Sequence, residues 1–223
     1  MSSIAENIQT LQKSLPEQIT LVAVSKTKPI ADLQEAYDAG QRVFGENKIQ
    51  EMTEKSEVLS KDIEWHMIGH VQTNKVKYMA SYVHLIHAVD SLKLLKEINK
   101  QAKKHGRIIN CLLQLRIAQE ETKFGLTQVD LTAILQSEAI HTLKNIKITG
   151  LMGMASFTED KNQVEKEFDF LKEAFDSLKE KPLELKNCDL QTLSMGMSGD
   201  YSVAIECGST MIRVGSAIFG VRK

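Results

Sequence analysis

Eight short apolar segments alternate with longer amphipathic ones along the chain, and this alternation constrains the fold more than any other feature. Strands that alternate with helices form a parallel sheet, because each return to a parallel neighbour needs a crossover. We expect strands near residues 19–24, 42–44, 64–68, 83–87, 108–115, 146–150, 189–193 and 210–214. We expect helices near residues 30–39, 47–59, 73–80, 91–104, 127–140, 161–179 and 199–205.

Two architectures fit this order of elements: a closed (β/α)8 TIM barrel and an open, doubly wound sheet. The count of eight strands favours the barrel, and no G-x-G-x-x-G motif follows any of them. No linker rich in proline, glycine and serine divides the chain. We therefore predict an α/β fold in which residues 1–223 form a single barrel domain.

An additional helix is predicted ahead of the first strand, within residues 1–18. Ser3 and Glu6 stand three residues apart, which is the spacing of a capping box. Apolar side chains follow at helical spacing, at Ile4, Ile8, Leu11 and Leu15. We expect this helix to pack on the barrel.

Composition narrows the classes of function. The formal net charge of the 223 residues is −1, so the protein as a whole has no electrostatic attraction to nucleic acid or to an anionic membrane. Cys111, Cys188 and Cys207 are far apart and odd in number, so neither a disulfide framework nor a zinc-binding C-x-x-C pair is expected. The chain shows no apolar run of signal-peptide or membrane-spanning length. A cytoplasmic location is predicted, without nucleic-acid or membrane partners.

A lysine follows the first predicted strand. The stretch "ITLVAVSKTKP" is apolar on both faces up to Val24 and then delivers Ser25 and Lys26. In a barrel this is the carboxyl end of a strand, where the chemistry is found. Lys26 either lies along the rim with its ammonium in water or is an amine that forms a Schiff base. The lysine alone does not separate these interpretations.

Two glycine- and serine-containing turns follow the last two predicted strands. Gly215 and Ser216 come directly after one strand, and Ser198 and Gly199 lie where a helix begins. Exposed amides and hydroxyls in such turns bind anions, and barrels commonly bind phosphate after strands seven and eight. They could also be ordinary turns, but the position of both beside a rim lysine favours a phosphate site.

Arg213 lies inside the last predicted strand, between Ile212 and Val214. A buried guanidinium must be paired or face a ligand. It could pair with Glu206 or another carboxylate. It could also face the heterocycle of a phosphorylated cofactor.

His66 and His70 are spaced four residues apart, a spacing that binds metal when both lie on one helix. Here the segment begins as a strand and Gly69 intervenes, so the two need not share a face. No third ligand stands at a supporting spacing, and no metal site is predicted.

Five blocks of the chain carry a family resemblance: "AVSKTKP", "FGENKIQE", "WHMIGHVQTNK", "GLMGMASF" and "LSMGMSGDYSVAIECGSTMIRVGSAIFG". Over about residues 19 to 220 the chain resembles the pyridoxal phosphate homeostasis proteins, the YggS/PROSC family. The resemblance implies a fold-type III, pyridoxal 5'-phosphate-binding barrel similar to the N-terminal domain of alanine racemase.

The resemblance also assigns roles to individual residues. Lys26 would hold the cofactor as a Schiff base, and Arg213 would approach its pyridine nitrogen. The phosphate would be held by Ser198, Gly215 and Ser216, together with Thr210. Around the ring we expect Asn47, Met154 and Ser194.

A guanidinium cannot accept the proton that an acidic partner would share with the pyridine nitrogen, so the ring would be a weaker electron sink. Racemases of this type add a tyrosine base from a second domain. We expect that domain to be lacking here, since "IFGVRK" follows the barrel directly, and Tyr201 is the only tyrosine in the C-terminal half.

The chain is therefore interpreted as a carrier of pyridoxal 5'-phosphate in vitamin B6 and amino-acid homeostasis, and not as an enzyme. No catalytic residue is assigned. We expect a monomer that meets cofactor-dependent apo-enzymes transiently. Two alternatives remain open: a racemase-like enzyme of fold type III that uses the same cofactor, and a Schiff-base aldolase that uses none.

Overall fold

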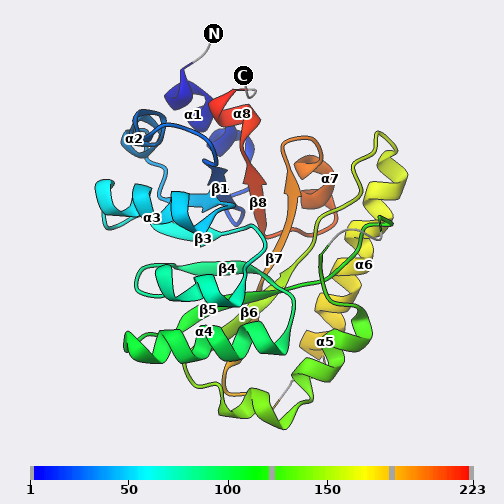
Figure 1. The fold of residues 1–223 in the computed structure, drawn as a ribbon. Helices are drawn as coiled ribbons and strands as arrows, with labels where there is room; N and C mark the ends of the chain where they lie inside the picture. Colours follow the sequence, from blue (N-terminus) through cyan, green and yellow to red (C-terminus); the bar gives the residue numbers. More distant parts are fainter. Residues whose placement is uncertain (1–2, 121–123, 181–183, 221–223) are drawn as a thin grey trace.

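Eight parallel strands close into a barrel in the computed structural model of the chain, which describes residues 3–120, 124–180 and 184–220. Each strand pairs with the next one in the sequence, and β1 pairs with both β2 and β8 (Figure 1). The predicted (β/α)8 barrel is confirmed. The strands are β1 Thr20–Val24, β2 Val43–Glu46, β3 Glu64–Met67, β4 Leu85–Val89, β5 Ile109–Gln114, β6 Ile146–Met152, β7 Cys188–Met197 and β8 Met211–Val214.

Helices connect the strands and surround the barrel (Figure 1). Their bounds are α1 Ile4–Ser14, α2 Ile30–Asp38, α3 Ile49–Val58, η1 Thr73–Tyr78, α4 Leu92–Lys104, α5 Gln128–Leu135, η2 Glu138–Thr142, α6 Lys161–Glu180, α7 Tyr201–Glu206 and α8 Ser216–Phe219. Three details differ from the sequence-based expectation. The segment predicted at 73–80 is a 3-10 helix, the one at 127–140 is divided into α5 and η2, and the short α8 follows β8.

The predicted capping box begins α1. Ser3 Oγ accepts a hydrogen bond from the Glu6 amide at 3.1 Å, and Glu6 Oε2 accepts one from the Ser3 amide at 2.9 Å. These bonds satisfy amides that have no partner inside the helix. The helix lies beside α8, where Asn7 Nδ2 donates to the Ile218 carbonyl at 2.9 Å (Figure 1).

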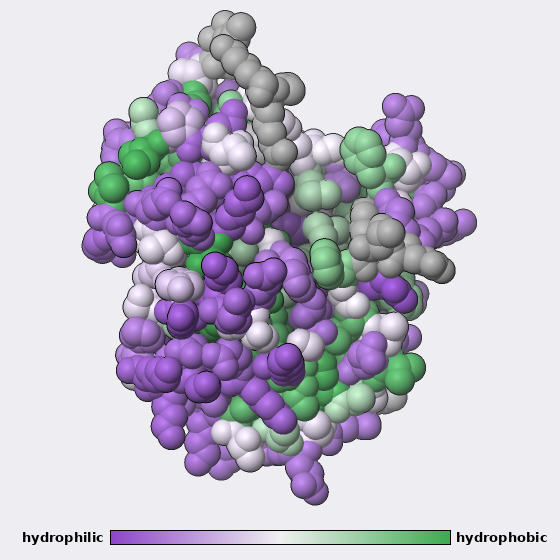
Figure 2. Space-filling view, in the orientation of Figure 1, coloured by the Kyte–Doolittle hydropathy of each residue, from purple (hydrophilic) through white to green (hydrophobic). Residues whose placement is uncertain are grey.

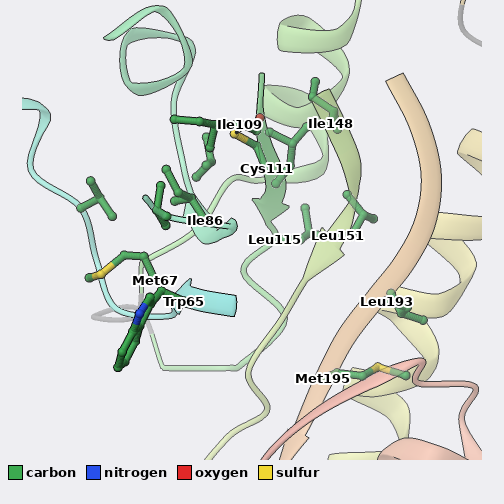
Figure 3. Packing of buried hydrophobic residues seen from close by; sticks show 14 of the residues in the cluster. Trp65, Met67, Ile86, Ile109, Cys111, Leu115, Ile148, Leu151, Leu193 and Met195 are labelled. Atoms are coloured by element: carbon green, nitrogen blue, oxygen red, sulfur yellow. Dashed lines mark hydrogen bonds between the residues drawn. The ribbon is translucent and has the colours of Figure 1, made fainter. Parts of the chain in front are cut away.

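The apolar core has two layers, because successive side chains of a strand point to opposite faces. The larger layer lies between the strands and the helices, and Figure 3 shows part of it along β3 to β7, including Trp65, Ile86 and Leu193. The smaller layer fills the inside of the barrel with Val22, Leu85, Ala88, Leu112, Met152 and Met211. In the strand register Val22 stands beside Arg213, and Leu85 beside His66. Arg213 and His66 therefore also point into the barrel.

The surface in Figure 2 is mostly hydrophilic on the side of α3 and α4, and more hydrophobic side chains gather around α5. Val129 of α5 is an exposed apolar residue of this region, with 77% of its surface accessible. No helix among the described residues has the length and apolar character needed to cross a membrane.

Candidate functional site

A cavity of about 670 Å³ opens at the carboxyl ends of the strands, which is within the usual size range of ligand pockets. The structure brings most of the predicted site residues together here, and the exceptions are Ser194 and Thr210. The predicted residues that line the cavity are Lys26, Asn47, Met154, Ser198, Arg213, Gly215 and Ser216.

Lys26 is carried by a turn with one unusual backbone conformation. The next residue, Thr27, has φ of 64°, in the left-handed region that a β-branched residue rarely adopts. The Thr27 amide donates to Glu51 Oε1 at 2.6 Å, and the Lys28 amide donates to the Ser25 carbonyl at 3.0 Å. Such strain persists only where surrounding contacts over-determine it. The position of Lys26 is therefore fixed by the turn.

A buried ionic group lies behind this turn, which we call the Lys55 cluster: Ser25, Glu46, Glu51 and Lys55. Lys55 Nζ donates to Glu46 Oε1 and Glu51 Oε1, both at 2.7 Å, and to the Ser25 carbonyl at 2.8 Å. Ser25 Oγ donates to Glu46 Oε1 at 2.6 Å. Burial raises the pKa of the Glu46 carboxyl, and the bonds from Lys55 and Ser25 oppose this shift. The cluster ties the end of β1 to β2 and α3.

Lys28 lines the same cavity as Lys26. Its Nζ donates to the carbonyls of Phe219 and Gly220, at 2.8 and 3.3 Å. These two bonds connect the turn to the end of α8.

Arg213 lies on β8 inside the barrel, where only 4% of its surface is accessible. Nη1 donates to Ser194 Oγ at 2.5 Å, and Nη2 donates to the Gly153 carbonyl at 3.0 Å. The pairing with Glu206 that the sequence left open is not formed. Burial lowers the pKa of Arg213 to about 10, against an opposing effect of the Asp200 charge, so the guanidinium is charged at neutral pH. Its two acceptors are neutral groups.

Two histidines extend this arrangement into what we call the interior chain: Arg213, Ser194, His87 and His66. His87 Nδ1 lies 3.1 Å from Ser194 Oγ, and His87 Nε2 lies 3.0 Å from His66 Nδ1. Burial, with smaller effects of neighbouring charges, lowers the pKa of His66 to about 3 and places that of His87 well below its ordinary value. Both rings are neutral at neutral pH, so each offers one donor and one acceptor.

Ser194 requires a correction. It was expected to line the ligand pocket, but β7 continues to Met197, and Ser194 is a fully buried residue inside that strand. It contacts Arg213 and His87 beneath the cavity. Its effect on a ligand would be exerted through Arg213.

The two predicted anion-binding turns lie next to each other after β7 and β8. Ser198 Oγ accepts a hydrogen bond from the Gly215 amide at 3.2 Å, which joins them. A side chain at Gly199 would meet no atom within 4 Å, whereas one at Gly215 would come within 3.2 Å of the Val24 carbonyl. The glycine at 215 thus permits close packing of β8 on β1 as well as approach by a ligand.

Thr210 also requires a correction. It precedes β8, so it lies at the amino end of the strand, whereas Gly215 and Ser216 follow the carboxyl end. Its hydroxyl accepts from the Leu193 amide at 2.8 Å, and its carbonyl accepts from the Thr20 amide at 2.9 Å. The length of a strand separates Thr210 from Gly215 and Ser216, so the structure does not bring it together with the other predicted phosphate-binding residues.

His66 and His70 have separate partners, in agreement with the expectation that they need not share a face. His70 lies in the wall of the cavity, where its Nδ1 is 3.2 Å from Asp90 Oδ2 and its ring stacks on Phe124. Ile68, Phe124 and Phe157 give the cavity an apolar side that sequence reasoning missed. Nothing in their local sequence distinguishes them from core residues.

An amine, a buried guanidinium and a turn rich in amides and hydroxyls thus surround one cavity. The guanidinium and the turns suit an anionic ligand with a ring acceptor, and the amine suits a carbonyl group.

The family described as "Alanine racemase, N-terminal domain" matches residues 1–223. A pyridoxal phosphate homeostasis protein of Pasteurella multocida is 37% identical over 100% of this chain and 96% of its own length. Its counterpart in Escherichia coli is 35% identical over 100% of this chain and 98% of its own.

Solved structures give a consistent result. PipY of Synechococcus elongatus, determined with PLP bound, has a TM-score of 0.88 and 35% identity, covering 98% of this chain and all of its own. An alanine racemase of Clostridium difficile has a TM-score of 0.79 at 14% identity, and the match covers 57% of that chain. This second likeness concerns the fold alone.

Proposed function

The chain belongs to the family of pyridoxal phosphate homeostasis proteins, and from this premise we propose that it binds pyridoxal 5'-phosphate in the cavity at the carboxyl end of its barrel. The relative solved with PLP bound supports the choice of ligand. The observation that carries the proposal is Arg213, a buried cation in the cavity wall that donates to two neutral acceptors, Ser194 Oγ and the Gly153 carbonyl.

The residues present fit this cofactor. Lys26 would hold the aldehyde as a Schiff base, and Arg213 would donate to the pyridine nitrogen. Ser198, Gly215 and Ser216 would contact the phosphate, while Asn47 and Met154 would lie against the ring. When bound, the cofactor supplies an electron sink. A guanidinium partner would weaken this sink, because a group that only donates hydrogen bonds leaves the pyridine nitrogen unprotonated.

We propose a carrier role in vitamin B6 and amino-acid homeostasis, without robust turnover. Its support is the name shared by the relatives, together with the guanidinium of Arg213 at the position that we propose for the ring nitrogen, where a carboxylate would make a stronger electron sink. The protein would act as a monomer that meets apo-enzymes transiently. Cys111, Cys188 and Cys207 are all free, which supports a reducing compartment such as the cytoplasm.

Borohydride reduction of the protein mixed with pyridoxal 5'-phosphate, followed by peptide mass spectrometry, tests the site. We expect the label on Lys26 and its loss in Lys26→Ala. Lys28→Ala is the matched control, because Lys28 lines the same cavity two residues away and should leave the label on Lys26. A label on Lys28, or none in the wild type, would contradict the proposal.

The carrier role has its own test. The loaded protein is mixed with a cofactor-dependent apo-enzyme, and recovery of that enzyme's activity is followed. Exchange of the amino-acid α-proton for deuterium is measured in parallel. Transfer without exchange supports a carrier, and exchange that disappears in Lys26→Ala favours the racemase-like alternative.

A further inference from the structure

We infer that Glu64, His66 and His84 form a binding site for a divalent transition-metal ion of the zinc class, at the amino end of the barrel. This site goes beyond the proposed cofactor function and lies at the other end of the strands. Each of the three residues offers one ligand atom, and these atoms all lie within 4.8 Å of one another. Glu64 is the first residue of β3, and His84 directly precedes β4.

The strand register explains why Glu64 and His66 lie on the same face of β3. Glu64 stands beside Val43 and His66 beside Leu85, and both of these neighbours belong to the layer inside the barrel. Glu64 Oε2 lies 3.6 Å from His84 Nε2, near the distance between two ligands of one tetrahedral ion.

His66 points independently to a ligand. Its ring is buried, with 2% of its surface accessible, and its Nε2 has no hydrogen-bond partner among the described residues. Nδ1 is already engaged by His87 Nε2. A buried ring nitrogen without a partner is costly, and binding of a metal ion would satisfy it.

The interior chain supplies the support that a metal-bound histidine normally has. Metal-binding histidines donate their other ring N–H to an acceptor, which fixes the tautomer and the ring orientation. With the ion on Nε2, His66 would carry its proton on Nδ1 and donate to His87 Nε2. His87 would then donate from Nδ1 to Ser194 Oγ, and that oxygen can accept from both His87 and Arg213. The ring N–H groups of both histidines and the Arg213 N–H toward Ser194 would then each have a defined acceptor.

Two imidazoles and one carboxylate match zinc and its neighbours among divalent transition metals better than calcium or magnesium, which prefer oxygen ligands. Three protein ligands leave a fourth position for water. The rings of His66 and His84 now stack at 16°, so His84 must turn to aim its lone pair at a shared ion. It has the freedom to do so, because 44% of its side chain is exposed.

The experiment uses the full chain without pyridoxal phosphate, so that its outcome is independent of the proposed cofactor function. Zinc chloride is titrated against a competing chelator dye, and cobalt(II) replaces zinc for visible spectroscopy. We expect one equivalent of zinc to bind. Glu64→Gln and His84→Ala should each weaken this binding by at least about tenfold, since loss of even an outer-shell partner costs that much.

Glu64 and His84 are the residues of choice because both are partly exposed and their substitution should not prevent folding. His141→Ala is the matched control, since it removes another exposed histidine outside the cluster and should bind zinc as the wild type does. Long-range 1H–15N spectra should show metal-dependent shifts at His66 Nε2 with the proton on Nδ1.

Absence of zinc binding, or equal binding by the wild type and His84→Ala, would overturn the site. A thiolate-to-cobalt charge-transfer band would also overturn it, because the ion would then be held by a cysteine.

Discussion

The interior chain and the Lys55 cluster are both buried polar groups close to the cavity, yet their cations have opposite kinds of partner. In the Lys55 cluster an ammonium contacts two carboxylates, each at 2.7 Å. In the interior chain a guanidinium contacts a serine hydroxyl and a backbone carbonyl, and two neutral histidines continue the chain. One group compensates its cation internally, and the other does not.

This difference matches what each group supports. The Lys55 cluster lies outside the barrel wall, where it fixes the turn that carries Lys26, and an ion pair with defined geometry serves that purpose. Arg213 reaches the cavity itself. Neutral acceptors hold its position while leaving its charge available to a ligand, which a carboxylate partner would largely cancel.

Substitution of Lys55 by methionine should have the largest effect on stability. It leaves the fully buried Glu46 without its cation, and breaking a buried pair typically costs about 3–5 kcal/mol of unfolding free energy. The measurement is urea denaturation. Lys147→Met is the control, because Lys147 contacts Asp189 at the same 2.7 Å distance with both side chains exposed. Its denaturation midpoint should barely change.

Equal losses in these two variants would mean that burial does not distinguish the pairs. The interpretation of the Lys55 cluster as a structural anchor would then fail.

The stability deficit of Lys55→Met should depend on pH. The pKa of Glu46 is already raised by burial, and loss of Lys55 removes two of the influences that lower it. A carboxyl whose pKa is higher in the folded than in the unfolded protein favours the folded state most at low pH, below its unfolded pKa. This contribution to the unfolding free energy is lost as the pH rises through the folded pKa. The deficit relative to the wild type should therefore be larger at pH 8 than at pH 5.

The double variant Glu46→Gln/Lys55→Met provides the control for this pH dependence. It removes the titrating carboxyl, so its deficit should be nearly the same at both pH values. Urea midpoints at pH 5 and pH 8 decide the matter. A single-variant deficit that shrinks toward pH 8 would contradict the assignment to Glu46.

Ser194→Ala should have an intermediate effect on stability and a specific effect on the cofactor. It leaves one N–H of Arg213 and one nitrogen of His87 without a partner, which should cost about 1–3 kcal/mol. It should also shift the visible absorbance of bound pyridoxal phosphate, because Arg213 loses one of its supports. Ser209→Ala is the control. This serine is also buried, but its hydroxyl donates to the Met195 carbonyl, which is not part of the interior chain, so the absorbance of the cofactor should stay unchanged.

The barrel was predictable from the sequence because its strands are apolar and each connection between them is long enough for a crossover. The position of Lys26 followed, since the carboxyl end of a parallel strand has only one location in a barrel. His87 and Ser194 were not predictable as partners, because 107 residues separate them and only the closed sheet brings them together. Lys55 gave no signal, since a lysine in an amphipathic helix normally faces water.

Ser194 and Thr210 lie outside the cavity for the same physical reason. Each is near an anion-binding turn in the sequence, but the length and direction of the strand beside it place it elsewhere. Ser194 stands within the block that ends in the anion-binding turn, but pairing with β6 and β8 extends β7 past it. Thr210 precedes Gly215 by five residues, and an intervening extended strand carries it away from the turn.

Removal of the hydroxyl group from Ser198 or from Thr210 tests this difference in position, and its expected effects are the smallest. Ser198 and Thr210 each accept one backbone amide, from Gly215 and Leu193 respectively, but they lie at opposite ends of β8. Ser198→Ala should weaken pyridoxal phosphate binding roughly tenfold, the worth of one hydrogen bond to a charged group, and leave pyridoxal binding unchanged. Thr210→Val should alter neither. Equilibrium titration followed by absorbance compares them, and a matching loss in Thr210→Val would restore the phosphate role that the geometry denies it.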